Sequence, residues 1–489
     1  MTTHHVHPAT PVHLGPAEPS LRQVYAPHDD LFTLSIVLTE ECNLRCSYCY
    51  QDSKRLTGTM DRSTARAAIE RALTTDSEFH HVMIEFIGGE VTLHWDMLTD
   101  LIDWAHGEAH RWTKHHSFFI DTNATMLTEE RKDWLRERRD WVIVGTSLDG
   151  TRDAHDINRC GSFDDVLPQL PFLVENWPDQ TIKMTLSPAT VPYLYRGILE
   201  TMAHGFQVAA NVPMEDIWGT AEQKAETVAE FRRQIEMLAA FFSENPDLPI
   251  PSIINLPIQI IHSEERDRPW CGSGRSMAAV DVDGTLLPCN RYARMSFDHA
   301  LIEKPIADVR LACTSCLFKP ACQTCEAHNW EANGNPNART RFHCEFTKLQ
   351  VWGTAQVRFH RLSRLIAWIE KEYDEGRGSD QLDQELLFTH LQLQLIGEIL
   401  SHFEAAERDG LPLHEVGTRA RAGEAFVPPT EALWAQTGMF TPLPGSIAAR
   451  RETQRLEADA VRQRRRGERG SSLLVTQARE LMPDPAPAE

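Results

Sequence analysis

Three cysteines within eight residues have the spacing of a metal or cluster site. Cys42, Cys46 and Cys49 form the pattern C-x3-C-x2-C in the segment CNLRCSYC, directly after the apolar run LFTLSIVLT at 31–39. Three thiolates on one short loop can ligate three irons of a [4Fe–4S] cluster. The fourth iron would then have no protein ligand and could bind a small molecule.

Seven further cysteines gather in one later segment of the chain. They are Cys271, Cys289, Cys313, Cys316, Cys322, Cys325 and Cys344. With Cys160 the total is eleven, an odd number in a chain without an export signal, which favours thiols or metal ligands in a reducing compartment. Zinc competes with iron–sulfur clusters for both groups. It needs four closely spaced ligands, and the spare candidates near the first group are Glu40 and Glu41.

The remaining cysteine, Cys160, stands alone in the segment NRCGSFDD. The simplest interpretation is a small buried apolar residue. The alternatives are a cluster ligand or a hydrogen-atom donor to a substrate radical.

Short apolar, β-branched runs alternate with amphipathic stretches through the first half of the chain. The runs are 31–39, 82–89, 116–123, 141–150 and 181–188, and the stretches include 61–73 and 128–138. This alternation predicts a parallel sheet with crossover helices, arranged as a whole or partial (β/α) barrel. Each run ends in polar residues or glycine, and ligands bind at that edge of parallel sheets.

Composition excludes several classes of protein. The 489 residues include 49 Lys and Arg against 70 Asp and Glu, a net charge of −21. Such a balance argues against a general nucleic-acid binder, which needs a basic face. No run approaches the roughly 18 apolar residues of a membrane span, and the N-terminus lacks the apolar core of a secretory signal. We therefore expect a cytoplasmic protein that does not bind membranes.

Three further motifs stand at predicted strand ends. They are IEFIGGE (84–90), DTNATML (121–127) and VGTSLDGTRDAHDINR (144–159). Together with the three-cysteine motif they resemble the radical S-adenosylmethionine (radical SAM) enzymes. Ala124 stands where that family usually has glycine.

The resemblance implies a role for each motif. Cys42, Cys46 and Cys49 would hold a [4Fe–4S] cluster whose open iron chelates SAM, and one electron would cleave SAM to a 5′-deoxyadenosyl radical. The residues implied in SAM binding are Tyr50 along the adenine, Gly88, Gly89 and Glu90 at the amine, and Asn123, Ser147 and Asp149 at the carboxylate or ribose.

The later cysteines resemble the SPASM domain of radical SAM enzymes that modify peptides. Gly284 stands five residues before Cys289, as that pattern requires, whereas two residues rather than three separate Cys322 from Cys325. The resemblance implies two auxiliary [4Fe–4S] clusters, one held by Cys271, Cys289 and Cys325 and the other by Cys313, Cys316, Cys322 and Cys344. The fourth ligand of the first could be Cys160, a non-cysteine side chain, or absent.

Four regions follow from these assignments. Residues 1–30 are expected to be a flexible His/Pro-rich tail, 31–250 a radical SAM partial (β/α)6 barrel resembling an incomplete TIM barrel, and 251–350 a small α/β SPASM domain. Residues 351–489 are expected to be a helical extension, because apolar positions recur at three- and four-residue steps in 351–373 and 381–403. An Arg-rich helix at 450–469 and a disordered tail would end the chain.

The resemblance also implies a substrate class. We expect a peptide maturase that forms a dehydrogenative C–C, C–O or C–S cross-link in a ribosomally made precursor peptide. Asn290 stands where the sulfatase-maturing branch has a basic Asp, and an amide cannot take that proton. Epimerisation, sulfatase-type oxidation of Cys or Ser, and a non-catalytic iron–sulfur or zinc protein such as a redox sensor remain alternatives.

Expected partners are the peptide or protein substrate and an electron donor such as flavodoxin or ferredoxin. Only about 30 residues precede the first predicted strand, fewer than a leader-binding domain needs. Leader recognition would then fall to a separate protein or to the 351–489 extension.

Overall fold

The computed structural model describes residues 30–51, 56–262, 271–309, 313, 316–418, 446 and 449–456. The predicted N-terminal tail and C-terminal disordered tail lie outside these residues. Of the predicted Arg-rich helix, residues 450–456 are helical and the remainder is not described.

Six parallel strands form the wall of a partial barrel. β1 (Leu31–Thr39), β2 (His81–Gly88), β3 (His115–Asp121) and β4 (Val142–Gly145) are neighbours in sequence order, and β5 (Ile182–Thr185) pairs with β6 (Val208–Asn211). A parallel bridge between Ser147 and Lys183 links the two sets beyond the end of β4. The predicted partial α/β barrel is therefore confirmed.

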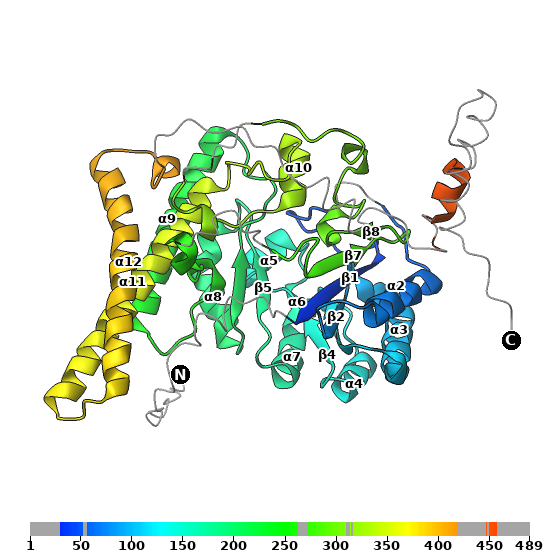
Figure 1. The fold of residues 1–489 in the computed structure, drawn as a ribbon, viewed down its shortest axis with the longest axis horizontal. Helices are drawn as coiled ribbons and strands as arrows, with labels where there is room; N and C mark the ends of the chain where they lie inside the picture. Colours follow the sequence, from blue (N-terminus) through cyan, green and yellow to red (C-terminus); the bar gives the residue numbers. More distant parts are fainter. Residues whose placement is uncertain are drawn as a thin grey trace.

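Helices cover the outer face of this wall, as Figure 1 shows for α2, α3 and α4. They are α2 (Arg62–Thr74), α3 (Trp95–Gly107), α4 (Glu129–Glu137), α5 (Arg152–Asn158), α6 (Phe163–Val166), α7 (Leu170–Asn176), α8 (Leu194–Ala203) and α9 (Ala221–Glu244). Asp61, Thr128 and Thr220 cap three of them by accepting backbone N–H bonds in the first turn.

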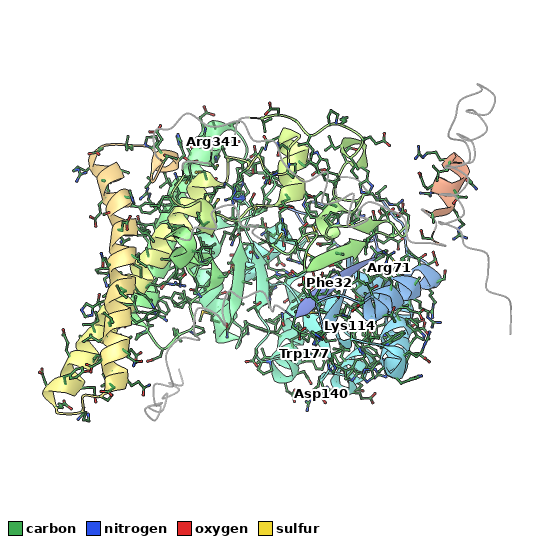
Figure 2. The ribbon with its side chains drawn as sticks, in the orientation of Figure 1. Phe32, Arg71, Lys114, Asp140, Trp177 and Arg341 are labelled. Carbon is green, nitrogen blue, oxygen red and sulfur yellow. The ribbon has the colours of Figure 1, made fainter. Side chains whose placement is uncertain are left out.

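Buried apolar side chains of the strands pack against these helices. Ile36, Phe86 and Phe118 are all fully buried in this core. Trp177, which follows α7, is buried as well, and its indole nitrogen donates to the Val142 carbonyl at 2.9 Å at the start of β4 (Figure 2). The rigid end of each strand thus fixes where the following polar loop begins.

A hairpin from the later part of the chain extends the same sheet. β7 (Met277–Val280) pairs in parallel with β1, and β8 (Leu286–Leu287) pairs antiparallel with β7. Gly284 lies in the turn between these two strands, with φ of +89°. The sheet therefore continues past residue 250, and the proposed division of the chain into four regions stays a prediction.

In the described part of the chain, further α-helices follow the hairpin. α10 (Glu326–Asn333) is short, while α11 (Cys344–Asp374) and α12 (Asp380–Arg408) form the long helical pair at the edge of the molecule opposite α2 and α3 (Figure 1). Both predicted C-terminal helices are present, and both are longer than predicted. No helix in the described part of the chain is both long and apolar enough to cross a membrane.

Candidate functional site

An open cavity of about 1480 Å³ lies at the carboxyl ends of the barrel strands. Its lining includes Cys42, Cys46 and Cys49 from the loop after β1, and residues from the loops after β2, β3, β4 and β6. Asn290, Arg291 and Cys325 line the same cavity. The centre of a water molecule can reach about 490 Å³ of this space, a volume within the range of ordinary small-molecule pockets. The cavity can therefore hold a small molecule.

The two glycines after β2 hold the start of the cysteine loop. The Gly89 N–H donates to the Thr39 carbonyl at 2.9 Å, and the Glu90 N–H donates to the Glu41 carbonyl at 2.7 Å. A Cβ atom at Gly89 would lie 2.1 Å from the Glu41 carbonyl oxygen. Only glycine permits this approach, so the Gly-Gly-Glu turn fixes the position of the loop that carries Cys42.

Glu90 lies in the cavity wall with its side chain 1% exposed, and its carboxylate is held by protein donors. Oε1 accepts from the Thr92 N–H and from the hydroxyls of Thr92 and Thr122, and Oε2 accepts from the Asn123 N–H at 2.7 Å. Burial raises the pKa of Glu90, and these hydrogen bonds oppose the rise. Glu90 thus joins the ends of β2 and β3, and its predicted role at the SAM amine stays a prediction.

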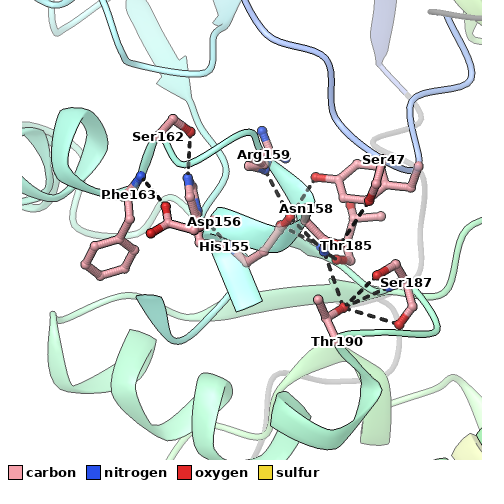
Figure 3. A network of polar contacts seen from close by, with 12 residues as sticks. Ser47, His155, Asp156, Asn158, Arg159, Ser162, Phe163, Thr185, Ser187 and Thr190 are labelled. Carbon is pink, nitrogen blue, oxygen red and sulfur yellow. Dashed lines mark hydrogen bonds and ion pairs between the residues drawn. The ribbon is translucent and has the colours of Figure 1, made fainter. Parts of the chain in front are cut away.

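Asp149 is a buried hub that joins three loops, and its partners Asn158, Arg159 and Thr185 are labelled in Figure 3. Its Oδ2 accepts from the Tyr48 hydroxyl at 2.8 Å and pairs with Arg159 Nε at 3.1 Å, and its Oδ1 accepts from the Thr185 N–H at 3.0 Å. Asn158 Nδ2 donates to the same carboxylate at 3.2 Å. The hub therefore ties the cysteine loop to the ends of β4 and β5.

Arg159 lines the cavity, whereas Asp149 does not. Its side chain is 9% exposed and lies over the Tyr48 ring, 5.6 Å from the centroid. Burial alone would lower the pKa of Arg159, but the Asp149 carboxylate raises it above its ordinary value. A fixed cation therefore lines the cavity beside Cys46.

The structure brings most residues of the predicted site together around one cavity. Tyr50, Gly88, Gly89, Glu90, Asn123 and Ser147 all line the cavity with the first three cysteines. Asp149 is buried behind Arg159 and is absent from that lining. Sequence analysis did not assign Tyr48 and Arg159. The arginine that ends HDINR was a usable signal, whereas Tyr48 had none beyond its place between two cysteines.

Four later cysteines surround a second cavity of about 660 Å³. They are Cys313, Cys316, Cys322 and Cys344, the set that the SPASM resemblance implies for one cluster. Arg339 and Lys348 line the same cavity, and so does Arg341, which is labelled in Figure 2. Arg339 Nη1 donates to the Cys322 carbonyl at 2.9 Å. Cationic side chains therefore surround a set of thiols that becomes anionic on metal binding.

The three cysteines implied for the other auxiliary cluster also lie near one another. Cys271 and Cys325 each raise the pKa of Cys289, after the larger effect of burial, which raises that pKa to about 12. Among the described residues, no three His, Cys, Asp or Glu side chains are close enough together to hold one metal ion.

The donor chemistry fits iron–sulfur clusters at all three places. Burial raises the pKa of Cys46 to about 12 and of Cys344 to about 11, so these thiols are protonated at neutral pH. A bound cationic metal replaces the proton, because only the thiolate is a ligand. Soft thiolate donors of this kind select iron–sulfur clusters, zinc or copper(I).

Cys160 is exposed, so the prediction of a buried apolar residue is wrong. It has φ of +58°, and its Sγ lies 3.0 Å from the Arg45 carbonyl oxygen on the cysteine loop. The sharp turn after α5 turns this side chain outward.

Comparisons with known proteins identify the barrel. Residues 36–188 match the family model described as the Radical SAM superfamily. This part of the chain is a radical SAM domain.

Two curated relatives each match part of the chain. Fe-coproporphyrin III synthase of Methanosarcina barkeri is 33% identical over 152 residues, which are 30% of this chain and 34% of the relative. The antilisterial bacteriocin subtilosin biosynthesis protein AlbA of Bacillus subtilis is 29% identical over 132 residues, 26% of this chain and 27% of the relative. The chain thus spans only about a third of the length of the first relative and about a quarter of the second.

A solved structure extends the likeness in fold beyond the barrel. The structure described as "Native anSMEcpe with bound AdoMet and Kp18Cys peptide" has a TM-score of 0.51 at 17% identity. The match covers 66% of this chain and 97% of the chain in that structure. The likeness supports the fold of the barrel and of part of the chain beyond it.

Proposed function

We propose that this chain is a radical SAM peptide maturase that forms a dehydrogenative cross-link in a precursor peptide. The observation that carries the proposal is the single cavity that joins the Cys42–Cys46–Cys49 loop to Asn290 and Cys325. A substrate in this cavity would lie between the radical source and the first auxiliary cluster. The solved relative with bound AdoMet and a peptide supports the same two occupants.

The chain's own residues prepare the site. When bound, the clusters and SAM would supply a 5′-deoxyadenosyl radical and an acceptor for the second electron of the oxidation. Cys42, Cys46 and Cys49 would hold the first cluster, and the Gly88–Gly89 turn fixes their loop.

Four cavity-lining side chains would bind SAM. Tyr50 offers an aromatic face to the adenine, and Asn123 and Ser147 offer amide and hydroxyl groups. Arg159, held by Asp149, offers a fixed cation to the SAM carboxylate.

Two auxiliary clusters would occupy the later cysteine groups. Cys313, Cys316, Cys322 and Cys344 line one cavity and would supply four ligands to one cluster. The other set has Cys271, Cys289 and Cys325. Cys160 bonds the loop at Arg45 instead, which gives no support to it as the fourth ligand.

Asn290 favours cross-linking over sulfatase-type oxidation. It lines the cavity at the place where the sulfatase-maturing branch has a basic Asp. Its amide can orient a substrate group by hydrogen bonding, but it cannot remove a proton. A cross-link takes two hydrogens from the peptide, one as an atom passed to the radical and one as a proton and an electron.

A cytoplasmic setting suits this chemistry, because free thiols persist in a reducing compartment. An electron donor of the flavodoxin or ferredoxin class would supply the electron that cleaves SAM. Leader recognition is assigned to a separate protein or to the helical extension.

Mass spectrometry of the substrate tests the proposal. The short peptide encoded beside this gene is co-expressed anaerobically with the wild-type chain and with a Cys42/Cys46/Cys49→Ala variant. We expect a loss of about two mass units per event with the wild type alone. An unchanged peptide mass would overturn the cross-link, and deuterium uptake from heavy water would then indicate epimerisation.

A further inference from the structure

Arg291 lies between the two sites that the proposed function needs. Its guanidinium lies over the ring of Tyr50, 4.6 Å from the centroid. Tyr50 directly follows Cys49, the last cysteine of the first motif. The Arg291 side chain also lines the large cavity with Cys325. Arg291 is therefore a direct physical link between the cysteine loop and the auxiliary cysteines.

The Arg291 side chain is fixed from several sides. Nη2 pairs with Glu215 Oε1 at 2.7 Å, from the loop after β6, and Nη1 donates to the Ser296 carbonyl at 2.7 Å. Glu331 of α10 lies 3.7 Å from Nη1. Only 12% of the side chain is exposed. A buried cation held by this many partners has one fixed position relative to the thiols.

Its charge lies close to the auxiliary cysteines. Arg291 follows Cys289 by two residues in the chain, and it lines the same cavity as Cys325. Positive charge and N–H donors near cluster thiolates are levers that set a reduction potential.

We propose that Arg291 is a positioning residue that holds Tyr50 in place for SAM and raises the reduction potential of the centre at Cys271, Cys289 and Cys325. This inference rests on the proposed function. Adding an electron makes a cluster more negative, so a nearby fixed cation stabilises the reduced form. Glu215 neutralises part of that charge and lowers the potential.

Arg339 gives a matched control. Its guanidinium donates to the Cys322 carbonyl at 2.9 Å. It lines the second cavity and is absent from the lining of the first. The two arginines should therefore act on different centres.

The experiment uses the full chain, anaerobically reconstituted with iron and sulfide. EPR-monitored redox titration gives the potential of each centre, and equilibrium titration with SAM gives its dissociation constant. The variants are Arg291→Gln, Arg291→Lys, Glu215→Gln and Arg339→Gln.

We expect Arg291→Gln to lower the potential of one auxiliary centre and to weaken SAM binding about two- to fivefold through loss of the Tyr50 stack. Arg291→Lys should keep the potential close to that of the wild type, because the charge remains. Glu215→Gln should raise the same potential, and Arg339→Gln should lower that of the other auxiliary centre. Arg291→Gln and Glu215→Gln should therefore change the potential in opposite directions, which a loss of packing in both variants would not do.

Two outcomes would overturn the inference in distinguishable ways. If the wild type, Arg291→Gln and Glu215→Gln all carry a full complement of iron and have the same potentials, the role proposed for Arg291 is wrong and the proposed function stands. If wild type binds only about four irons per chain, the auxiliary clusters are absent, and both the proposal for Arg291 and that part of the proposed function fail.

Discussion

At the scale of single residues, the Asp149–Arg159 pair carries the first prediction. Asp149→Asn leaves the Arg159 cation buried without its counter-charge, and this should cost about 3–5 kcal/mol of the free energy of unfolding. Denaturant unfolding at neutral pH measures the loss. Asp164→Asn is the control, since it breaks an exposed Arg152–Asp164 pair and should leave the unfolding midpoint unchanged. Equal effects of the two substitutions would contradict the role of burial.

His155 makes stability depend on pH. It is fully buried, its Nδ1 accepts from the Asp149 N–H at 3.2 Å, and its Nε2 lies 3.0 Å from the Ser162 hydroxyl. Burial lowers its pKa to about 4 from the usual 6.5. Between these values the unfolded chain binds a proton that the folded chain does not, so stability falls as the pH drops from 6.5 to 4. The loss due to this one group is about 3 kcal/mol.

Other buried histidines titrate in the same range, so the test compares slopes. His155→Asn keeps an acceptor near the Asp149 N–H and removes the titration. The free energy of unfolding of the variant should fall less steeply than that of wild type between pH 6.5 and 4. Parallel curves would show that His155 does not titrate in this way.

Sequence reasoning located single residues well where their chemistry depends on type and spacing. The cysteine motifs were recognised by their spacing, and Tyr50, Asn123 and Ser147, which line the cavity, were expected from the resemblance of their motifs to radical SAM enzymes. The separation of Asp149 from the cavity could not be foreseen, because it depends on Arg159 turning inward from α5. Side-chain direction at a loop depends on packing, and a single sequence does not encode that packing in any local pattern.

At the scale of elements, the glycine turn after β2 carries a sharp prediction. Gly89→Ala places a Cβ against the Glu41 carbonyl and should cost about 1–3 kcal/mol while displacing the cysteine loop. Iron and sulfide content after reconstitution should fall. Gly107→Ala is the control, because a Cβ there has nothing within 4 Å. If Gly89→Ala loads as much iron as Gly107→Ala, the turn does not position the loop.

The two faces of α12 should respond differently to substitution. Ile399 is 1% exposed and packs in a core that includes residues of α11, whereas Leu391 is 52% exposed. Ile399→Ala should cost about 2–5 kcal/mol. Leu391→Gln should change the free energy of unfolding by no more than about 0.5 kcal/mol. A comparable loss for both, measured by denaturant unfolding, would show that the outer face is also packed in solution.

Elements with strong periodicity were predictable. Buried strands such as β1 read as continuous β-branched runs, and α9, α11 and α12 repeat apolar positions at helical spacing. The partnership of β7 with β1 was not predictable, since about 240 residues separate them and parallel pairing has no local signal. One sheet therefore contains strands from both sides of the predicted boundary near 250, and the division into regions stays a prediction.

At the scale of the whole molecule, distant segments close around one cavity. Glu40, at the start of the cysteine loop, forms a two-point pair with Arg294 at 2.9 and 3.1 Å, and its side chain is 1% exposed. Arg291 makes a second link a few residues earlier. The later part of the chain is thus fixed against the first cysteine loop, as a substrate held between two sites requires.

The most direct test of the central claim is the formation of 5′-deoxyadenosine. The full chain, reconstituted anaerobically and reduced with dithionite, is incubated with SAM, and the products are separated by liquid chromatography. We predict 5′-deoxyadenosine from wild type and none from the Cys42/Cys46/Cys49→Ala variant. Wild-type protein with a complete set of irons that leaves SAM intact, or equal product from the variant, would contradict the account.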